Sequence, residues 1–204
     1  VLASAAANGC SEMATALVTG IITMMFNWTM LTCVGEDGVA AVTIIMYVLM
    51  FASSLYTGYS YGVAPMLSFY HGEQNREKLK KLVALSRKVI GVVSVITVAV
   101  SLGLTEPLVS VFARPEDPVY ALAVTGNRIC TIALLFIGFN IFASGMFTGL
   151  SNGVVSAVLA FSRSFVLMLA AMIVLPLLLG VNGIWLATPA AELMALLLSA
   201  GVYW

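Results

Sequence analysis

The stretch VAAVTIIMYVLMFASSLYTGYSYGVAPM, residues 39–66, carries no charged side chain and decides the fold class. A helix that crosses the roughly 30 Å hydrocarbon core of a bilayer needs about 20 residues. Five further apolar stretches fill most of the 204-residue chain, so that the full set is 11–33, 39–66, 83–104, 119–142, 154–179 and 184–204. A barrel would show short alternating segments instead. The sequence therefore predicts an all-α integral membrane protein with a bundle of six transmembrane helices.

The composition supports this class and excludes others. The chain is 61% hydrophobic and 9% charged, with a mean hydropathy of +1.07, which excludes a soluble domain of this size. No basic stripe is present that would bind nucleic acid. The three cysteines are scattered and show no metal-ligand spacing, so we interpret them as small buried hydrophobic residues and expect no metal site. No catalytic motif is visible, so no enzyme activity is expected.

The distribution of basic residues predicts the orientation in the membrane. The loop HGEQNREKLKK, residues 71–81, and the two basic residues that follow it hold six of the nine lysines and arginines. By the positive-inside rule this loop is cytoplasmic, and six crossings then place both ends of the segment in the cytoplasm of a cell, or bacterial inner, membrane. We also expect a helix from Asn75 to Lys88, a short surface helix within 105–118, and Asp117 as the N-cap of the fourth crossing.

Glycine and proline predict irregular helices in two places. The second crossing contains Gly58, Gly62 and Pro65 within a short span, and Pro65 predicts a bend near its cytoplasmic end. Pro189 lies well inside the last crossing and leaves the carbonyl of Trp185 without its helical donor. Bent helices next to polar residues often line the cavities of transporters, but many prolines only bend a membrane helix.

Glu192 is the most informative single residue. At about 1.5 Å per residue it lies roughly 13 Å beyond Gly183, close to mid-bilayer. An ionised carboxylate at that depth must pair, face water or take up a proton. Arg163 in the preceding crossing is the candidate partner. One interpretation is a carboxyl group that couples transport to an ion, and the other is a structural pair that locks two helices.

Other polar residues in apolar surroundings are candidates for contact with a substrate. Asn27 and Asn140 either bond neighbouring helices or face a cavity. Tyr47 and Ser54 are seven residues apart, so they share a face of the unusually polar second crossing. The eleven methionines either form an adaptable binding wall or simply pack or face lipid; among them are Met24, Met25, Met30, Met46 and Met50.

Three stretches together resemble the multidrug and toxic compound extrusion (MATE) exporters. The first, residues 35–75, contains the family's Gly-x-x-x-(Val/Leu)-Ala-Ala start, supplied here by Gly38 to Ala41. It also contains the Gly-x-Ser-x-Gly-x-x-Pro bend from Gly58 to Pro65 and the Gly-x-x-Asn loop from Gly72 to Asn75. It resembles the eighth helix of these exporters and the loop that follows. The others are FNIFASGMFTGLSNG (139–153) and LPLLLGVNGIWLATPAAE (175–192), which resemble the loop after the tenth helix and the join of the last two helices.

This resemblance implies a fold and a function. Such exporters have two six-helix lobes, so residues 1–204 would form the C-terminal lobe, with the N-terminal lobe of the same chain as partner. The implied activity is alternating access that exchanges organic cations for protons or sodium ions, with no other cofactor. Two departures concern coupling: Glu12 lies only at the mouth of the first crossing, and residues 148–153 lack the usual charges.

Two alternatives stay open. A lipid-linked oligosaccharide or polysaccharide flippase of the same superfamily would need more basic residues at its cavity, for which Arg163 and Arg128 are the candidates. A membrane scaffold without transport activity would have no polar residues facing a common cavity.

Overall fold

The computed structural model describes the backbone of residues 2–203 and the side chains of residues 17–201. The helices in chain order are α1 (Leu2–Cys33), α2 (Glu36–Gly72), α3 (Arg76–Gly103), α4 (Thr105–Ser110), α5 (Pro118–Cys130), a 3₁₀ turn (Thr131–Ala133), α6 (Leu134–Gly149), α7 (Gly153–Phe161), a π-helical turn (Ser162–Leu167), α8 (Met168–Leu179) and α9 (Val181–Tyr203). No strand occurs in the described backbone, so the predicted all-α fold is confirmed.

These helices combine into six crossings. Helices α5 and α6 run end to end through the 3₁₀ turn, and α7 and α8 do so through the π-helical turn. Five of the resulting spans are long and apolar enough to cross a membrane, and the described part of α1, Leu17–Cys33, is a shorter apolar helix. This arrangement agrees with the predicted bundle of six helices.

The helices extend beyond the apolar stretches that predicted them. Helix α2 continues to Gly72, and α3 already begins at Arg76, so the expected helix over the basic residues is the first part of the third crossing. The Asn75 side chain accepts a hydrogen bond from the Lys78 backbone N–H at 3.1 Å and caps α3. Hydropathy marks only the part of a helix that lies in hydrocarbon, whereas backbone hydrogen bonding continues into the hydrated interface.

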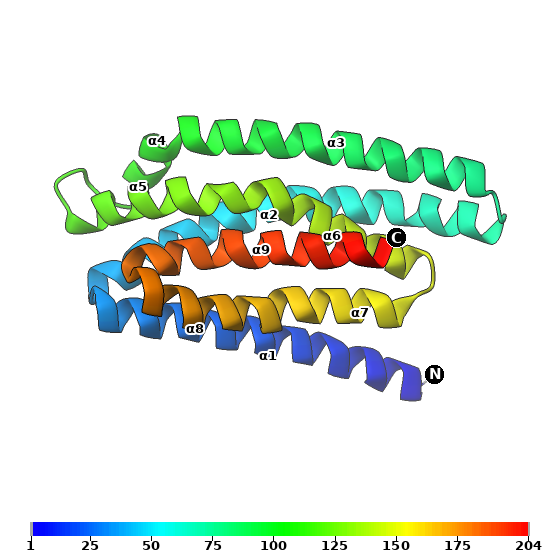
Figure 1. Cartoon of the computed structure of the whole chain (residues 1–204), viewed down its shortest axis with the longest axis horizontal. Helices are drawn as coiled ribbons and strands as arrows, with labels where there is room; N and C mark the ends of the chain where they lie inside the picture. Colours follow the sequence, from blue (N-terminus) through cyan, green and yellow to red (C-terminus); the bar gives the residue numbers. More distant parts are fainter. Residues whose placement is uncertain (1, 204) are drawn as a thin grey trace.

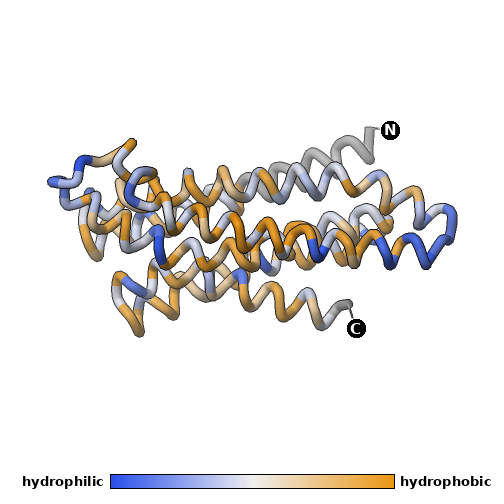
Figure 2. The backbone as a smooth tube through the Cα atoms, turned by 90° about the horizontal axis from the view of Figure 1, so that it is seen from above, coloured by the Kyte–Doolittle hydropathy of each residue, from blue (hydrophilic) through white to orange (hydrophobic). Residues whose placement is uncertain are grey.

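The turns gather at two ends of the bundle. The α2–α3 turn, the α6–α7 turn, the start of α1 and the end of α9 lie at one end, whereas α4 and the α8–α9 turn lie at the other (Figure 1). Hydrophilic residues concentrate at these ends, and the hydrophobic residues lie between them (Figure 2). The two free ends of the segment therefore share a side with the basic loop.

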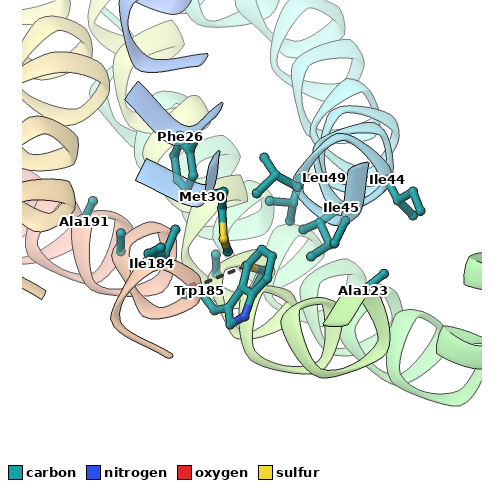
Figure 3. Close-up of a cluster of buried hydrophobic side chains, with 14 of the residues drawn as sticks. Phe26, Met30, Ile44, Ile45, Leu49, Ala123, Ile184, Trp185 and Ala191 are labelled. Carbon is teal, nitrogen blue, oxygen red and sulfur yellow. Dashed lines mark hydrogen bonds between the residues drawn. The ribbon is translucent and has the colours of Figure 1, made fainter. Parts of the chain in front are cut away.

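The core centres on Trp185 of α9, which is 2% exposed. Figure 3 shows Phe26 and Met30 from α1, Ile45 from α2 and Ala123 from α5 around it. Helix α9 and the α5–α6 span are the most enclosed crossings, whereas most residues of α3 and of the α7–α8 span face outward. The centre of the lobe therefore lies along α9, which also carries Glu192.

The end of the bundle opposite the basic loop contains the predicted short helix, α4, and the predicted N-cap residue, Asp117. The Asp117 carboxylate, however, accepts a hydrogen bond from the Arg114 backbone N–H at 3.1 Å and makes none to the first turn of α5. The buried Asn127 amide of α5 donates to the Thr105 hydroxyl at 3.0 Å and so fastens α4 to the bundle.

Candidate functional site

A polar centre lies between α6 and α9, on the buried side of Glu192. The Asn140 Nδ2 group donates to Glu192 Oε2 at 2.7 Å and to the Glu192 backbone carbonyl at 2.8 Å. Both residues are buried, at 4% and 8% exposure. The acceptor atom of the same amide, Asn140 Oδ1, has no hydrogen-bond partner among the described residues. A carboxylate and an unpaired amide oxygen therefore share one buried site.

Arg163 approaches Glu192 from the other side, as the sequence predicts. Its Nε atom lies 3.6 Å from Glu192 Oε1, within the distance of an ion pair but too long for a good hydrogen bond. None of the described residues accepts a hydrogen bond from the guanidinium group. The pair is close enough to offset part of the cost of placing a buried carboxylate and a half-buried guanidinium group in the membrane, yet the Arg163 terminal nitrogens have no acceptor among the described residues.

The backbone around Arg163 was not anticipated. Residues Ser162–Leu167 form a π-helical turn between α7 and α8. Such turns insert one extra residue, rotate the side chains that follow, and are frequent at functional sites. Their hydrogen-bonding pattern has no sequence signature, so periodicity alone could not reveal this one.

A cavity of about 300 Å³ opens in front of the Arg163–Glu192 pair. Its polar wall contains Ser53, Ser164 and Thr188, which sequence reasoning did not single out as a group. Its apolar wall contains Met46 and Met50 together with five residues from α1, α2, α6 and the start of α8, namely Val18, Ile22, Leu49, Ile137 and Met168. Two of the methionines for which the sequence left a binding wall and plain packing open, Met46 and Met50, therefore line this space.

The other predicted substrate contacts lie elsewhere. Tyr47 is 52% exposed and stacks on Phe112, with ring centroids 6.3 Å apart. The exposed Ser54 hydroxyl donates to the Met50 carbonyl of its own helix. Asn27 lines a separate depression between α1 and α2. Asn140 lies behind Glu192 and is absent from the residues that line the cavity. The structure thus brings together three predicted residues, Asn140, Arg163 and Glu192.

The predicted helix-bend residues also have defined places. Pro189 is buried in α9, and the Trp185 carbonyl that it leaves without a helical donor accepts a bond from the Cys130 thiol, with the sulfur 3.2 Å away (Figure 3). Cys130 is therefore a hydrogen-bond donor between α5 and α9 and more than a hydrophobic filler. Gly58, Gly62 and Pro65 are exposed on α2, which remains helical through all three.

Comparisons with known proteins agree on one fold. A family profile described as MatE matches residues 11–174. The chain is similar to a multidrug resistance MATE family transporter of the MOP superfamily in its outward-facing conformation, with a TM-score of 0.85 and 21% identity. It is also similar to a MOP superfamily transporter from Pyrococcus furiosus (TM-score 0.85, 20% identity) and to a Vibrio cholerae MATE transporter in the bent form (TM-score 0.84, 16% identity).

The alignments cover most of this chain but less than half of each solved transporter. The alignments include 94%, 94% and 95% of this chain, but only 43% of each solved transporter. The chain therefore spans less than half the length of these transporters and matches one of their lobes. A comparison with curated protein sequences found no match.

Proposed function

Because the chain belongs to the MatE family of membrane transporters, we propose that it forms the C-terminal lobe of a secondary active exporter. The exporter would expel organic cations in exchange for protons or sodium ions, by alternating access against an N-terminal lobe of the same protein. The observation that carries this proposal is the Glu192 carboxylate at the edge of a partly apolar cavity, where the buried Asn140 Nδ2 donates to it.

The chemistry of this site suits the exchange of an organic cation for a proton or a sodium ion. A proton on Glu192 removes its charge while Asn140 Nδ2 still donates to a carboxyl oxygen, and a sodium ion can bind the carboxylate through oxygen. The same carboxylate, when ionised, attracts an organic cation whose apolar body packs on Met46 and Met50. One carboxylate cannot hold both charges at once, so binding of the coupling ion displaces the drug. No enzyme activity and no other cofactor form part of this proposal.

The two alternatives find less support. Arg128, the second basic residue that a flippase would require, lies at the outer end, where its Nη2 contacts Glu106 Oε1 at 3.1 Å on an exposed surface. Arg163 is therefore the single basic residue among those that line the cavity. A scaffold without transport activity has no use for a cavity that gathers Ser53, Arg163 and Glu192 from three helical segments.

The first prediction concerns coupling. In proteoliposomes that contain the full-length protein, we expect Glu192→Gln to abolish extrusion of a fluorescent cationic dye driven by an imposed proton or sodium gradient. Glutamine keeps the size of the side chain and the contact with Asn140, but it carries no charge. Dye fluorescence should then follow the trace of empty liposomes.

The matched control is Glu106→Gln, which removes a carboxylate that also contacts an arginine but lies outside the cavity. Its transport rate should equal that of the wild type. Gradient-driven transport retained in Glu192→Gln would limit Glu192 to a structural role. Absence of dye movement in the wild type, with every dye and both ions, would contradict the drug-export proposal itself.

The second prediction concerns orientation. In a cysteine-free background, a membrane-impermeant maleimide added to intact cells should label Glu116→Cys in the outer loop and leave Glu73→Cys unlabelled. Both side chains are exposed and lie near opposite ends of the bundle. Inside-out membrane vesicles should give the reverse pattern, because the basic loop would face the medium. Labelling of Glu73→Cys on intact cells would invert the proposed topology.

A further inference from the structure

We propose that the cavity also binds amphipathic anions, through the terminal amino groups of Arg163, and that it does so when Glu192 carries a proton. This inference deepens the proposed function, since it concerns the same cavity. It adds a class of substrate whose binding depends on the proton in the opposite sense from that of a cation.

The first argument is the hydrogen-bonding inventory of Arg163. A guanidinium group has five N–H donors, and among the described residues the one acceptor near it is Glu192 Oε1, 3.6 Å from Nε. The side chain is 23% exposed and lines the cavity. Unpaired donors in such a place are costly, and two terminal amino groups match a carboxylate or sulfonate with two oxygens.

The second argument is the shape and polarity of the wall. The Arg163 head group shares its cavity with the hydroxyl-bearing Ser53 and Ser164, while Ile22, Met50 and Met168 supply apolar surface. This combination fits a molecule with one anionic group and an apolar body. Flexible methionines adapt to different apolar shapes, which suits a site without a single rigid ligand.

The third argument is the competition for Arg163. When Glu192 is ionised, it occupies the positive field of the guanidinium group and repels an anion from the same place. When Glu192 is protonated, Asn140 Nδ2 still donates to its carboxyl oxygen, and the Arg163 charge is left for the ligand. Among the described residues that line the cavity, Arg163 and Glu192 are the only charged groups, from the π-helical turn and α9; α1, α2 and α6 contribute none.

The sign of the pH dependence follows from this competition. A proton on Glu192 opposes the binding of a cation and promotes the binding of an anion. Where one proton is taken up with the ligand, the dissociation constant falls by at most about tenfold for each pH unit. Matched ligands of opposite fixed charge should therefore show opposite pH profiles at one site.

The experiment uses two naphthalene probes, a sulfonate and a trimethylammonium derivative, whose own charges do not change with pH. Binding to the full-length protein in nanodiscs of neutral phospholipid is measured between pH 5 and pH 8. For the wild type we expect the sulfonate to bind more tightly as the pH falls and the trimethylammonium probe to bind less tightly. Glu192→Gln should bind the sulfonate at every pH as tightly as the wild type does at its acid limit.

Variants of Arg163 make the assignment specific. Arg163→Gln should lose sulfonate binding, and Arg163→Lys, which keeps the charge but loses the fork of donors, should retain part of it. Arg128→Gln, which alters an exposed arginine outside the cavity, should bind both probes like the wild type. Size-exclusion profiles and near-ultraviolet spectra establish that each variant is folded before binding is measured.

The outcomes separate this inference from the proposed function. Cation binding that is lost in Glu192→Gln, without any sulfonate binding, would overturn the anion proposal and leave cation export standing. Sulfonate binding without cation binding would support the anion proposal and contradict the organic-cation substrate class. Sulfonate binding that is unchanged in Arg163→Gln, or that does not depend on pH, would overturn the anion site.

Discussion

Replacement of Gly183 by alanine is expected to lower the midpoint of thermal unfolding by more than about 6 °C, which for a chain of this size corresponds to about 3 kcal/mol. A Cβ atom at Gly183 would collide with the Leu175 carbonyl group and the Pro176 nitrogen of α8. These are backbone atoms, so they cannot rotate away as a side chain can. The collision would force apart α8 and α9 next to their turn, where Gly180 adopts a positive φ of 57°.

The control for this prediction is Gly20→Ala in α1. Apart from its chain neighbours and the local backbone of α1, no described atom lies within 4 Å of the Cβ position there, and alanine is the better helix former. The unfolding midpoint of Gly20→Ala should equal or exceed that of the wild type, as followed by size-exclusion chromatography after heating. An unfolding midpoint for Gly183→Ala close to that of the wild type would show that α8 and α9 are further apart than described.

Replacement of Arg163 by leucine alone should destabilise the lobe by about 3–5 kcal/mol, because it leaves the buried Glu192 carboxylate without its cationic partner. The double variant Arg163→Leu/Glu192→Gln should recover most of this loss. The neutral glutamine can still accept the Asn140 hydrogen bond, and no unpaired charge remains. The measurement is the unfolding midpoint of wild type, both single variants and the double variant.

A double-mutant cycle turns these four midpoints into a coupling free energy for the pair. The exposed pair of Arg128 and Glu106 provides the comparison, since exposed pairs typically contribute less than about 1 kcal/mol. A double variant no more stable than Arg163→Leu would mean that the lost stability comes from packing of the arginine stem and owes nothing to charge.

The sequence predicted the parts of the site whose residue types are rare in membrane helices. Charged residues are rare in membrane helices, so Glu192 in a last crossing without basic residues pointed to Arg163 in the preceding one, and the structure places the two in contact. The proline rule likewise identified the Trp185 carbonyl as the group that needs a new donor. The sequence could not identify Cys130 as that donor, because a single cysteine in an apolar helix shows no pattern that distinguishes a hydrogen-bond donor from a residue that only packs.

Other features depend on what lies opposite a helix face, which periodicity does not report. Tyr47 and Ser54 share a face of α2, but that face turns away from the Glu192 cavity, and their predicted contact with a substrate stays a prediction. Ser53, one residue away, points into the cavity. The same reasoning explains the helix ends: hydropathy found where each helix meets hydrocarbon, while capping by Asn75 set where α3 begins.

The two hydrogen bonds of Asn140 have a consequence for the order of events in the proposed transport. Its Nδ2 group binds the main chain of α9 as well as the Glu192 carboxyl group, and the main-chain contact does not depend on the charge of the side chain. In the proposed exporter, an ion on Glu192 would therefore require changes of side chains alone, while the main-chain hydrogen bond keeps α6 and α9 joined. Reorientation of whole lobes takes microseconds to milliseconds. If the proposed export is correct, ion binding at this site does not require the lobes to move, and the slow step would belong to that movement.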